Sequence, residues 1–87
     1  MNLGNWLYRQ AQAHPQRAAL YLGKEQITDY GGFHDRAARL AGWLMAQGIA
    51  PGDRVAMFMK NCPDYRIVQY GIWYAGAVAV PINAKPH

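Results

Sequence analysis

Hydrophobic positions near the start of the chain follow the period of an α-helix. Leu3, Trp6 and Leu7 fall on one face of residues 2–13, and the following His14-Pro15 disfavours further helix. We therefore predict an amphipathic helix over residues 2–13 that is anchored by Trp6 and Leu7.

Two short runs with strand character come next. Residues 17–22 (RAALYL) and 25–30 (EQITDY) are separated by Gly23-Lys24, which is a turn signal. This pattern predicts an antiparallel β-hairpin. Gly31-Gly32 then breaks the pattern, and we place the start of the next helix after it.

A second helical stripe covers residues 33–47. Gly48 is well placed to end this helix, and Pro51-Gly52 occupies the central positions of a type II turn, with Asp53 able to accept bonds from backbone donors. The apolar residues of the stripe recur at helical spacing: Phe33, Ala37, Leu40, Ala41, Leu44 and Met45.

The last third of the chain predicts a strand, a helix and a strand. Residues 55–59 (VAMFM) are continuously apolar, which is typical of a strand buried on both faces of a parallel sheet. Asn61 is a candidate N-cap, with Pro63 in the first turn of a helix that reaches about residue 75 and is apolar on nearly every side. Gly76 ends this helix, and residues 77–80 (AVAV) form a strand that Pro81 stops. We predict a right-handed βαβ unit.

These elements predict an α/β fold in the order helix, hairpin, helix, strand, helix, strand. The composition fits a globular chain, because 52% of its 87 residues are hydrophobic and 13% are aromatic. Cys62 is the single cysteine, so an internal disulfide is excluded. Only 16% of the residues are charged, which suggests that some apolar side chains face something outside these 87 residues.

The charge balance changes this interpretation little. A formal net charge of +4 admits a nucleic-acid partner, but the basic residues are scattered, and only Arg36 and Arg39 lie close together, beside Asp35. We favour a solvated basic surface and no nucleic-acid partner; the alternative predicts salt-dependent retention on DNA. The first ten residues lack the pattern of a signal peptide, and residues 67–82 are too short for a transmembrane segment. A cytoplasmic location is expected.

Catalytic and cofactor motifs are sparse. No G-x-G-x-x-G follows a predicted strand, and Ala77-Val78 stand where a phosphate loop at residues 71–76 would need Lys and Ser/Thr. Cys62 is a candidate nucleophile at a helix start, but the sequence places no base beside it. His34 lacks a carboxylate to orient it and is interpreted as a solvated or capping residue.

Metal ligands and base-stacking aromatics also lack a convincing pattern. His14, His34, His87 and Cys62 have no spacing suited to a metal site. We therefore predict no catalytic, cofactor-binding or metal-binding residue in this chain. One aromatic group recurs at helical spacing and is better explained by packing than by nucleobase stacking: Tyr65, Tyr70, Trp73 and Tyr74.

Several segments taken in order resemble the opening stretch of adenylate-forming (AMP-binding) enzymes. They are His14-Pro15 followed by residues 18–20 (AAL), residues 36–41 (RAARLA), 48–56 (GIAPGDRVA), 61–64 (NCPD) and 75–83 (AGAVAVPIN). This superfamily includes acyl-CoA synthetases, aryl-CoA ligases, adenylation domains and luciferases. One departure is that Asp29 and Gly32 stand where the family usually has Thr and Glu, so a less firm helix start is expected there.

The resemblance implies ATP, Mg²⁺ and CoA as cofactors of a larger parent enzyme that joins a carboxylic acid to CoA. The phosphate loop, the adenine and ribose segments and the adenylating lysine of the family come later than residue 87. Residues 1–87 are thus expected to form an incomplete N-terminal fragment of the large AMP-binding domain, inactive alone, whose partner is the remainder of the enzyme. Residues 82–87 resemble fatty or aryl acyl-CoA synthetases, and the isolated chain is expected to be poorly soluble or to form a homo-oligomer. The alternative is a self-contained α/β binding or interaction module.

Overall fold

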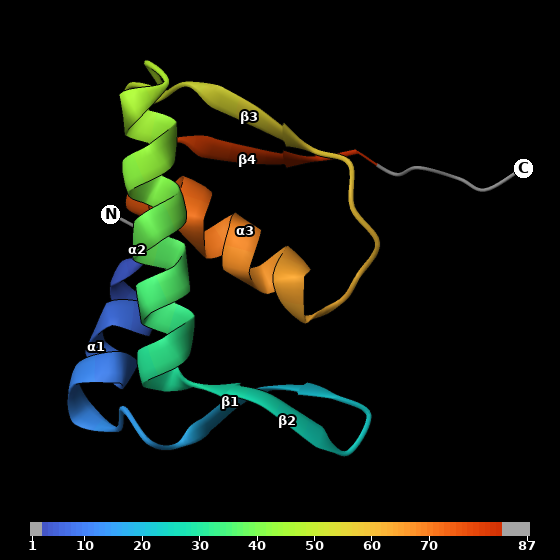
Figure 1. Cartoon of the computed structure of the whole chain (residues 1–87). Coiled ribbons are helices and arrows are strands. Elements are labelled where there is room, and N and C mark those ends of the chain that lie inside the picture. The colour runs from blue at the N-terminus through green and yellow to red at the C-terminus, as the bar shows by residue number, and fades with distance from the viewer. Residues whose placement is uncertain (1–2, 83–87) are drawn as a thin grey trace, which may run out of the picture.

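Two short sheets lie at opposite ends of one long helix, α2 (Figure 1). The computed structural model describes residues 3–82, and the predicted order of elements is confirmed. None of the helices within these residues is long and apolar enough to span a membrane. The elements are α1 Asn5–Ala13, β1 Ala18–Leu22, β2 Glu25–Asp29, α2 Tyr30–Ala46, β3 Arg54–Met57, α3 Pro63–Tyr74 and β4 Val78–Pro81.

The first helix and the hairpin agree with their predicted types. Leu7 is fully buried, as expected for an anchor, whereas Trp6 stays half-exposed. The helix begins at Asn5, and the predicted residue Asn2 lies outside the described residues. Strands β1 and β2 pair antiparallel around Gly23, whose φ of +62° is a conformation that suits glycine.

The predicted start of α2 is wrong by three residues. The helix begins at Tyr30 rather than Phe33, so both glycines of the Gly31-Gly32 pair lie in its first turn. The cause is Asp29, whose carboxylate accepts a 2.8 Å hydrogen bond from the Gly32 backbone N–H. A Cβ on Gly32 would overlap the Thr28 hydroxyl, so the close approach itself favours glycine. The bond from the Gly32 N–H to Asp29 is one of the two hydrogen bonds of a capping box. The other needs a glutamate side chain at position 32, where this chain has glycine.

Both long helices end in the same way, at a glycine with positive φ. Gly48 (φ +98°) donates to the Met45 carbonyl, and Ile49 donates to that of Leu44, over 3.0 and 3.1 Å. Gly76 (φ +77°) repeats this pattern at the end of α3. These are Schellman motifs, so the sequence prediction of two glycine-terminated helices is confirmed.

The predicted type II turn is also confirmed. Gly52 has a φ of +88°, and the Asp53 N–H donates to the Ala50 carbonyl over 3.0 Å. The Asp53 side chain accepts from the Ala50 N–H over 2.8 Å. The Gly52 N–H donates to the Gly76 carbonyl, and the Val78 N–H donates to the Asp53 carbonyl. These two hydrogen bonds hold the end of α3 beside the start of β3.

Strands β3 and β4 pair in parallel around α3, as predicted for a βαβ unit. Three details of the prediction are wrong. Phe58 and Met59 lie beyond the end of β3, Pro81 is the last residue of β4, and Cys62 rather than Asn61 is the N-cap of α3. Pro81 can end the strand although it has no N–H, because the N–H of the next residue, Ile82, donates to the Met57 carbonyl over 2.9 Å.

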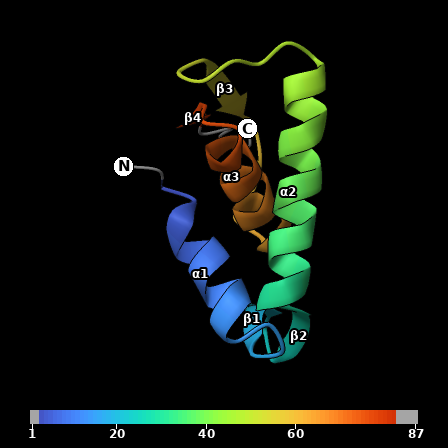
Figure 2. The same ribbon diagram turned by 90° about the vertical axis from the view of Figure 1, so that its left-hand side faces the viewer.

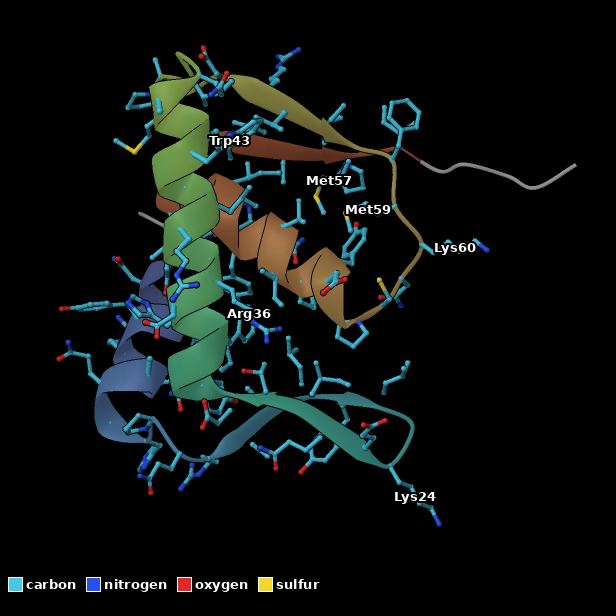
Figure 3. The ribbon with its side chains drawn as sticks, viewed as in Figure 1. Lys24, Arg36, Trp43, Met57, Met59 and Lys60 are labelled. Carbon is cyan, nitrogen blue, oxygen red and sulfur yellow. The ribbon has the colours of Figure 1, made fainter. Side chains whose placement is uncertain are left out.

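The sheet is not buried on both of its faces within residues 3–82. Val55, Met57 and Ala79 belong to the core under the sheet, whereas Ala56 and Val78 on the other face are exposed. Figure 3 shows Met57 and Met59 between the strands and α3. The prediction from continuous apolarity is therefore wrong for the described residues, because they supply only one covering layer.

Helix α2 packs against α1 and, more extensively, against α3 (Figure 2). Around it lie a lower core, which contains Leu7, Phe33 and Ile67, and an upper core, which contains Met57 and Ile72. Helices α2 and α3 approach each other closely at the buried Gly71, where a Cβ would lie 2.7 Å from Leu40 Cδ2. A glycine here lets α2 and α3 pack closely enough to unite the two cores.

Candidate functional site

Strands β3 and β4 end side by side, with Met57 opposite Pro81. Beyond these ends lies a cleft of about 350 Å³, which we call the carboxyl-end cleft. In open α/β sheets, ligands bind outside the carboxyl ends of parallel strands, so this is the natural candidate for a site. Its lining consists of Met59, Asn61, Tyr65, Arg66, Pro81 and Ile82.

The polar groups of the carboxyl-end cleft suit binding rather than catalysis. The Arg66 guanidinium lies 5.8 Å from the centre of the Tyr65 ring, and its Nη1 donates a 3.0 Å hydrogen bond to Gln69 Oε1. Among the described lining residues there is no carboxylate, histidine, cysteine or lysine. The arrangement can orient an anionic or polar group, but it lacks an evident nucleophile or general base.

The residues that the sequence singled out do not come together at this cleft. Cys62 is half-buried at the N-cap of α3, where its side chain makes no capping hydrogen bond. His14 is exposed at the end of α1, and His87 lies outside the described residues. Within residues 3–82, no three His, Cys, Asp or Glu side chains are grouped so that they could hold a metal ion.

His34 has a partner that the sequence did not indicate. Its Nδ1 lies 2.8 Å from the hydroxyl oxygen of Tyr74, forty positions along the chain. Its ring also lies 5.4 Å from the Tyr74 ring and 5.7 Å from the Tyr8 ring, centre to centre. The interpretation of His34 as a solvated or capping residue is therefore wrong: it is half-buried and links α2 to α3.

The protonation of Tyr74 follows from its surroundings. Burial, with smaller contributions from the Tyr70 and Tyr8 phenols, raises the pKa of Tyr74 to about 12. The hydroxyl therefore keeps its proton at neutral pH and can donate to a neutral His34 Nδ1. Among the hydrogen bonds of the described residues, none joins this pair to a carboxylate or a nucleophile. We therefore interpret the pair as a structural link between α2 and α3.

The aromatic side chains of α3 pack as predicted. Tyr70 meets Phe33 and Trp73 edge-on, at ring-centre distances of 5.2 and 4.8 Å. Trp6 from α1 approaches Tyr70 at 6.3 Å and Tyr30 at 5.9 Å. Edge-to-face contacts of this kind stabilise a core beyond the area that they bury.

The ordered series of turns and caps described above matches one known family. The sequence pattern of the family described as AMP-binding enzyme matches residues 7–86. The chain belongs to the AMP-binding enzyme family. A feruloyl-CoA synthase from Amycolatopsis is 42% identical over 83 residues, and a medium/long-chain-fatty-acid–CoA/3-oxocholest-4-en-26-oate–CoA ligase from Mycobacterium marinum is 35% identical over 85.

Solved structures of AMP-binding enzymes share the fold. The inhibitor-bound N-terminal domain of FACL13 from Mycobacterium tuberculosis superposes with a TM-score of 0.85 at 38% identity, over 94% of this chain and 21% of that one. The relatives above match 95% and 98% of this chain. In return, the chain spans only 17% and 15% of their length. The α/β fold of this chain is therefore that of the N-terminal region of adenylate-forming enzymes.

Proposed function

We propose that this chain is the opening scaffold segment of a larger AMP-binding domain in an ATP-dependent acyl-CoA synthetase. The family match and the ligases among its relatives support the enzyme class. The proposal makes residues 1–87 an incomplete part of that domain and leaves them inactive alone. Their partner is then the remainder of the enzyme.

The observation that carries this proposal is the uncovered face of the β3–β4 sheet, which we call the open sheet face. Side chains alternate between the two faces of a strand, so Ala56, Val78 and Val80 point away from the core, and Phe58 follows them. Phe58 is 70% exposed and Val78 is 48% exposed. Parallel sheets are covered on both faces, and on β3 and β4 this face is apolar apart from Arg54, which is exposed and pairs with Val78 at its start.

The proposed reaction needs groups that we assign to the remainder of the enzyme. A carboxylic acid attacks ATP, which gives an acyl-adenylate and pyrophosphate, and CoA thiol then displaces AMP to form the thioester. Residues 3–82 contain no group of three His, Cys, Asp or Glu side chains that could hold a metal ion, and the proposal assigns Mg²⁺, ATP and CoA to the remainder of the enzyme. We expect a fatty or aromatic acid as substrate, by likeness to the named ligases, and a cytoplasmic location.

A chimeric enzyme tests the scaffold role. The stretch of the Amycolatopsis feruloyl-CoA synthase that matches this chain is replaced by residues 1–87, and CoA-dependent ferulate turnover is measured. We expect the chimera to be active, and the same enzyme without the stretch to be inactive. Phe58→Ser in the chimera should lower activity and stability, because it puts a hydroxyl into an apolar contact.

Tyr21→Ser is the matched control. Tyr21 is also an exposed apolar residue, at 55%, but it lies on the hairpin, far from the open sheet face. The isolated chain, mixed with ATP, Mg²⁺, CoA and varied acids, should release no pyrophosphate. Turnover by the isolated chain would contradict the proposal. Equal behaviour of the two serine variants in the chimera would also contradict it, and would favour a self-contained binding or interaction module.

A further inference from the structure

A second cleft lies where α1, the hairpin and α3 meet, and we call it the aromatic cleft. Its volume is about 270 Å³, and its walls are ring side chains from three helices together with the apolar surface of β1. The rings hold one another edge-on, for instance Tyr70 at 85° to Phe33 and at 75° to Trp73. These edge-on contacts line a mostly apolar concavity.

Trp6 is the least covered part of this wall. Its side chain is 44% exposed although two tyrosine rings contact it. The hydrophobic surface left open on Trp6 faces the cleft that it lines. A planar ring placed there would cover apolar surface without disturbing the core beneath it.

The aromatic cleft also has a positive rim. Among its described lining residues, Arg66 is the one charged group, and Gln69 lies beside it. One Arg66 nitrogen, Nη1, donates to Gln69 Oε1 over 3.0 Å, which orients the guanidinium and leaves other N–H donors for a ligand. Burial raises the pKa of Tyr70, and the nearby Arg66 charge opposes this rise in part, so the charge acts toward the ring cluster.

We propose that the aromatic cleft binds a small planar aromatic anion, with the ring against Trp6 and Trp73 and a carboxylate on Arg66. The volume admits a single-ring compound, and the lining offers the few placed polar groups that ligand sites use. A guanidinium binds a carboxylate through two parallel hydrogen bonds, which favours this anion over a neutral group. The site lies outside the scaffold role and does not depend on it.

Indole N–H signals provide a direct test with benzoate as the probe. The chain has three tryptophans, and Trp43 lies 59% exposed on α2, outside the cleft lining (Figure 3). In proton–nitrogen correlation spectra of the 87-residue chain, benzoate should shift the Trp6 and Trp73 indole signals and leave that of Trp43 in place. For so small a ligand, we expect a dissociation constant on the order of 1 mM.

Two comparisons separate the aromatic and the charged contributions. Benzyl alcohol and cyclohexanecarboxylate should each bind at least about tenfold more weakly than benzoate, because each lacks one of the two contacts. Arg66→Met should weaken benzoate binding by about tenfold, whereas Arg54→Met, at an exposed arginine on β3, should not.

The control spectra also guard against misfolding, since dispersed indole signals in both arginine variants show that the fold is kept. Equal affinity for benzoate and benzyl alcohol would overturn the proposal. So would an Arg66→Met variant that binds benzoate like the parent chain, or a Trp43 shift as large as those of Trp6 and Trp73. No shift of any indole signal at tens of millimolar benzoate would also overturn it.

Discussion

Gly71→Ala is the substitution whose outcome the packing of α2 against α3 determines most directly. A Cβ at this buried position would lie 2.7 Å from Leu40 Cδ2 and 3.0 Å from both Cβ and Cγ of Leu40. The contacts to Cβ and Cγ lie close to the α2 backbone. A rotation of the leucine tip alone therefore cannot relieve them, and the two helices must separate slightly.

Two effects of opposite sign decide the change in stability. Alanine in a helix interior is favoured over glycine by about 0.5–1 kcal/mol. Overpacking of a well-filled contact costs about 1–3 kcal/mol. Because Gly71 is buried and the contacts involve atoms near the backbone, we expect overpacking to win and the free energy of unfolding to fall by about 1 kcal/mol.

Urea unfolding followed by circular dichroism measures this change, and Gly42→Ala is the matched control. Gly42 lies in α2 with no atom within 4 Å of its built Cβ, so the same substitution should raise the free energy of unfolding by about 0.5–1 kcal/mol. Adding Leu40→Ala to Gly71→Ala should remove the contacts with Cγ and Cδ2 and leave only the 3.0 Å contact with Cβ, so that the double variant is more stable than the sum of the single effects. If Gly71→Ala stabilises the chain as much as Gly42→Ala does, the close-packing argument is refuted.

Three further predictions concern single hydrogen bonds and one titration. Asp29→Ala removes the acceptor of the Gly32 N–H and should lower the free energy of unfolding by about 1 kcal/mol in urea, whereas Asp29→Asn should keep most of it. Burial raises the pKa of Tyr74 from 10.0 to about 12, so the contribution of the protonated Tyr74 to the free energy of unfolding is full below pH 10 and is lost as the pH rises through 12. The urea midpoint of the parent chain should therefore fall more steeply between pH 10 and pH 12 than that of Tyr74→Phe. Asp53→Ala removes the acceptor of the Ala50 N–H and should lower the free energy of unfolding by about 0.5–1 kcal/mol, which a small drop in the thermal midpoint would report. Asp53→Asn is the control, because it keeps an acceptor.

Local chemistry allowed most element types and ends to be predicted from the sequence. Gly48, Gly52 and Gly76 each need a positive φ, and each stands where the sequence places a helix end or a turn. The start of α2 at Tyr30 differs from the prediction because two consecutive glycines are typical of a break between elements. The Asp29 cap and the tight approach to Thr28 make glycine acceptable inside the first helical turn.

The long-range contacts could not be predicted in the same way. The bond between His34 and Tyr74 joins residues with no local relation in sequence, and the only hint was a polar ring beside an apolar helix stripe. The aromatic cleft likewise draws rings from α1, α2 and α3 to one place. Sequence periodicity assigned these aromatics correctly to packing, but it does not show which of them line a concavity.

The two exposed apolar surfaces of this chain differ in the chemistry that each can recognise. The open sheet face offers Ala56, Phe58 and Val78, with Arg54 at its edge, which suits a broad and mostly dry contact with another layer of protein. The aromatic cleft is small and has a guanidinium at its rim, which suits a small ligand that brings its own charge. The scarcity of charge in the sequence therefore has its structural counterpart in the open sheet face. Phe58→Ser should accordingly change the activity of the chimera and leave benzoate binding as it is, whereas Arg66→Met should weaken benzoate binding and leave the activity of the chimera as it is.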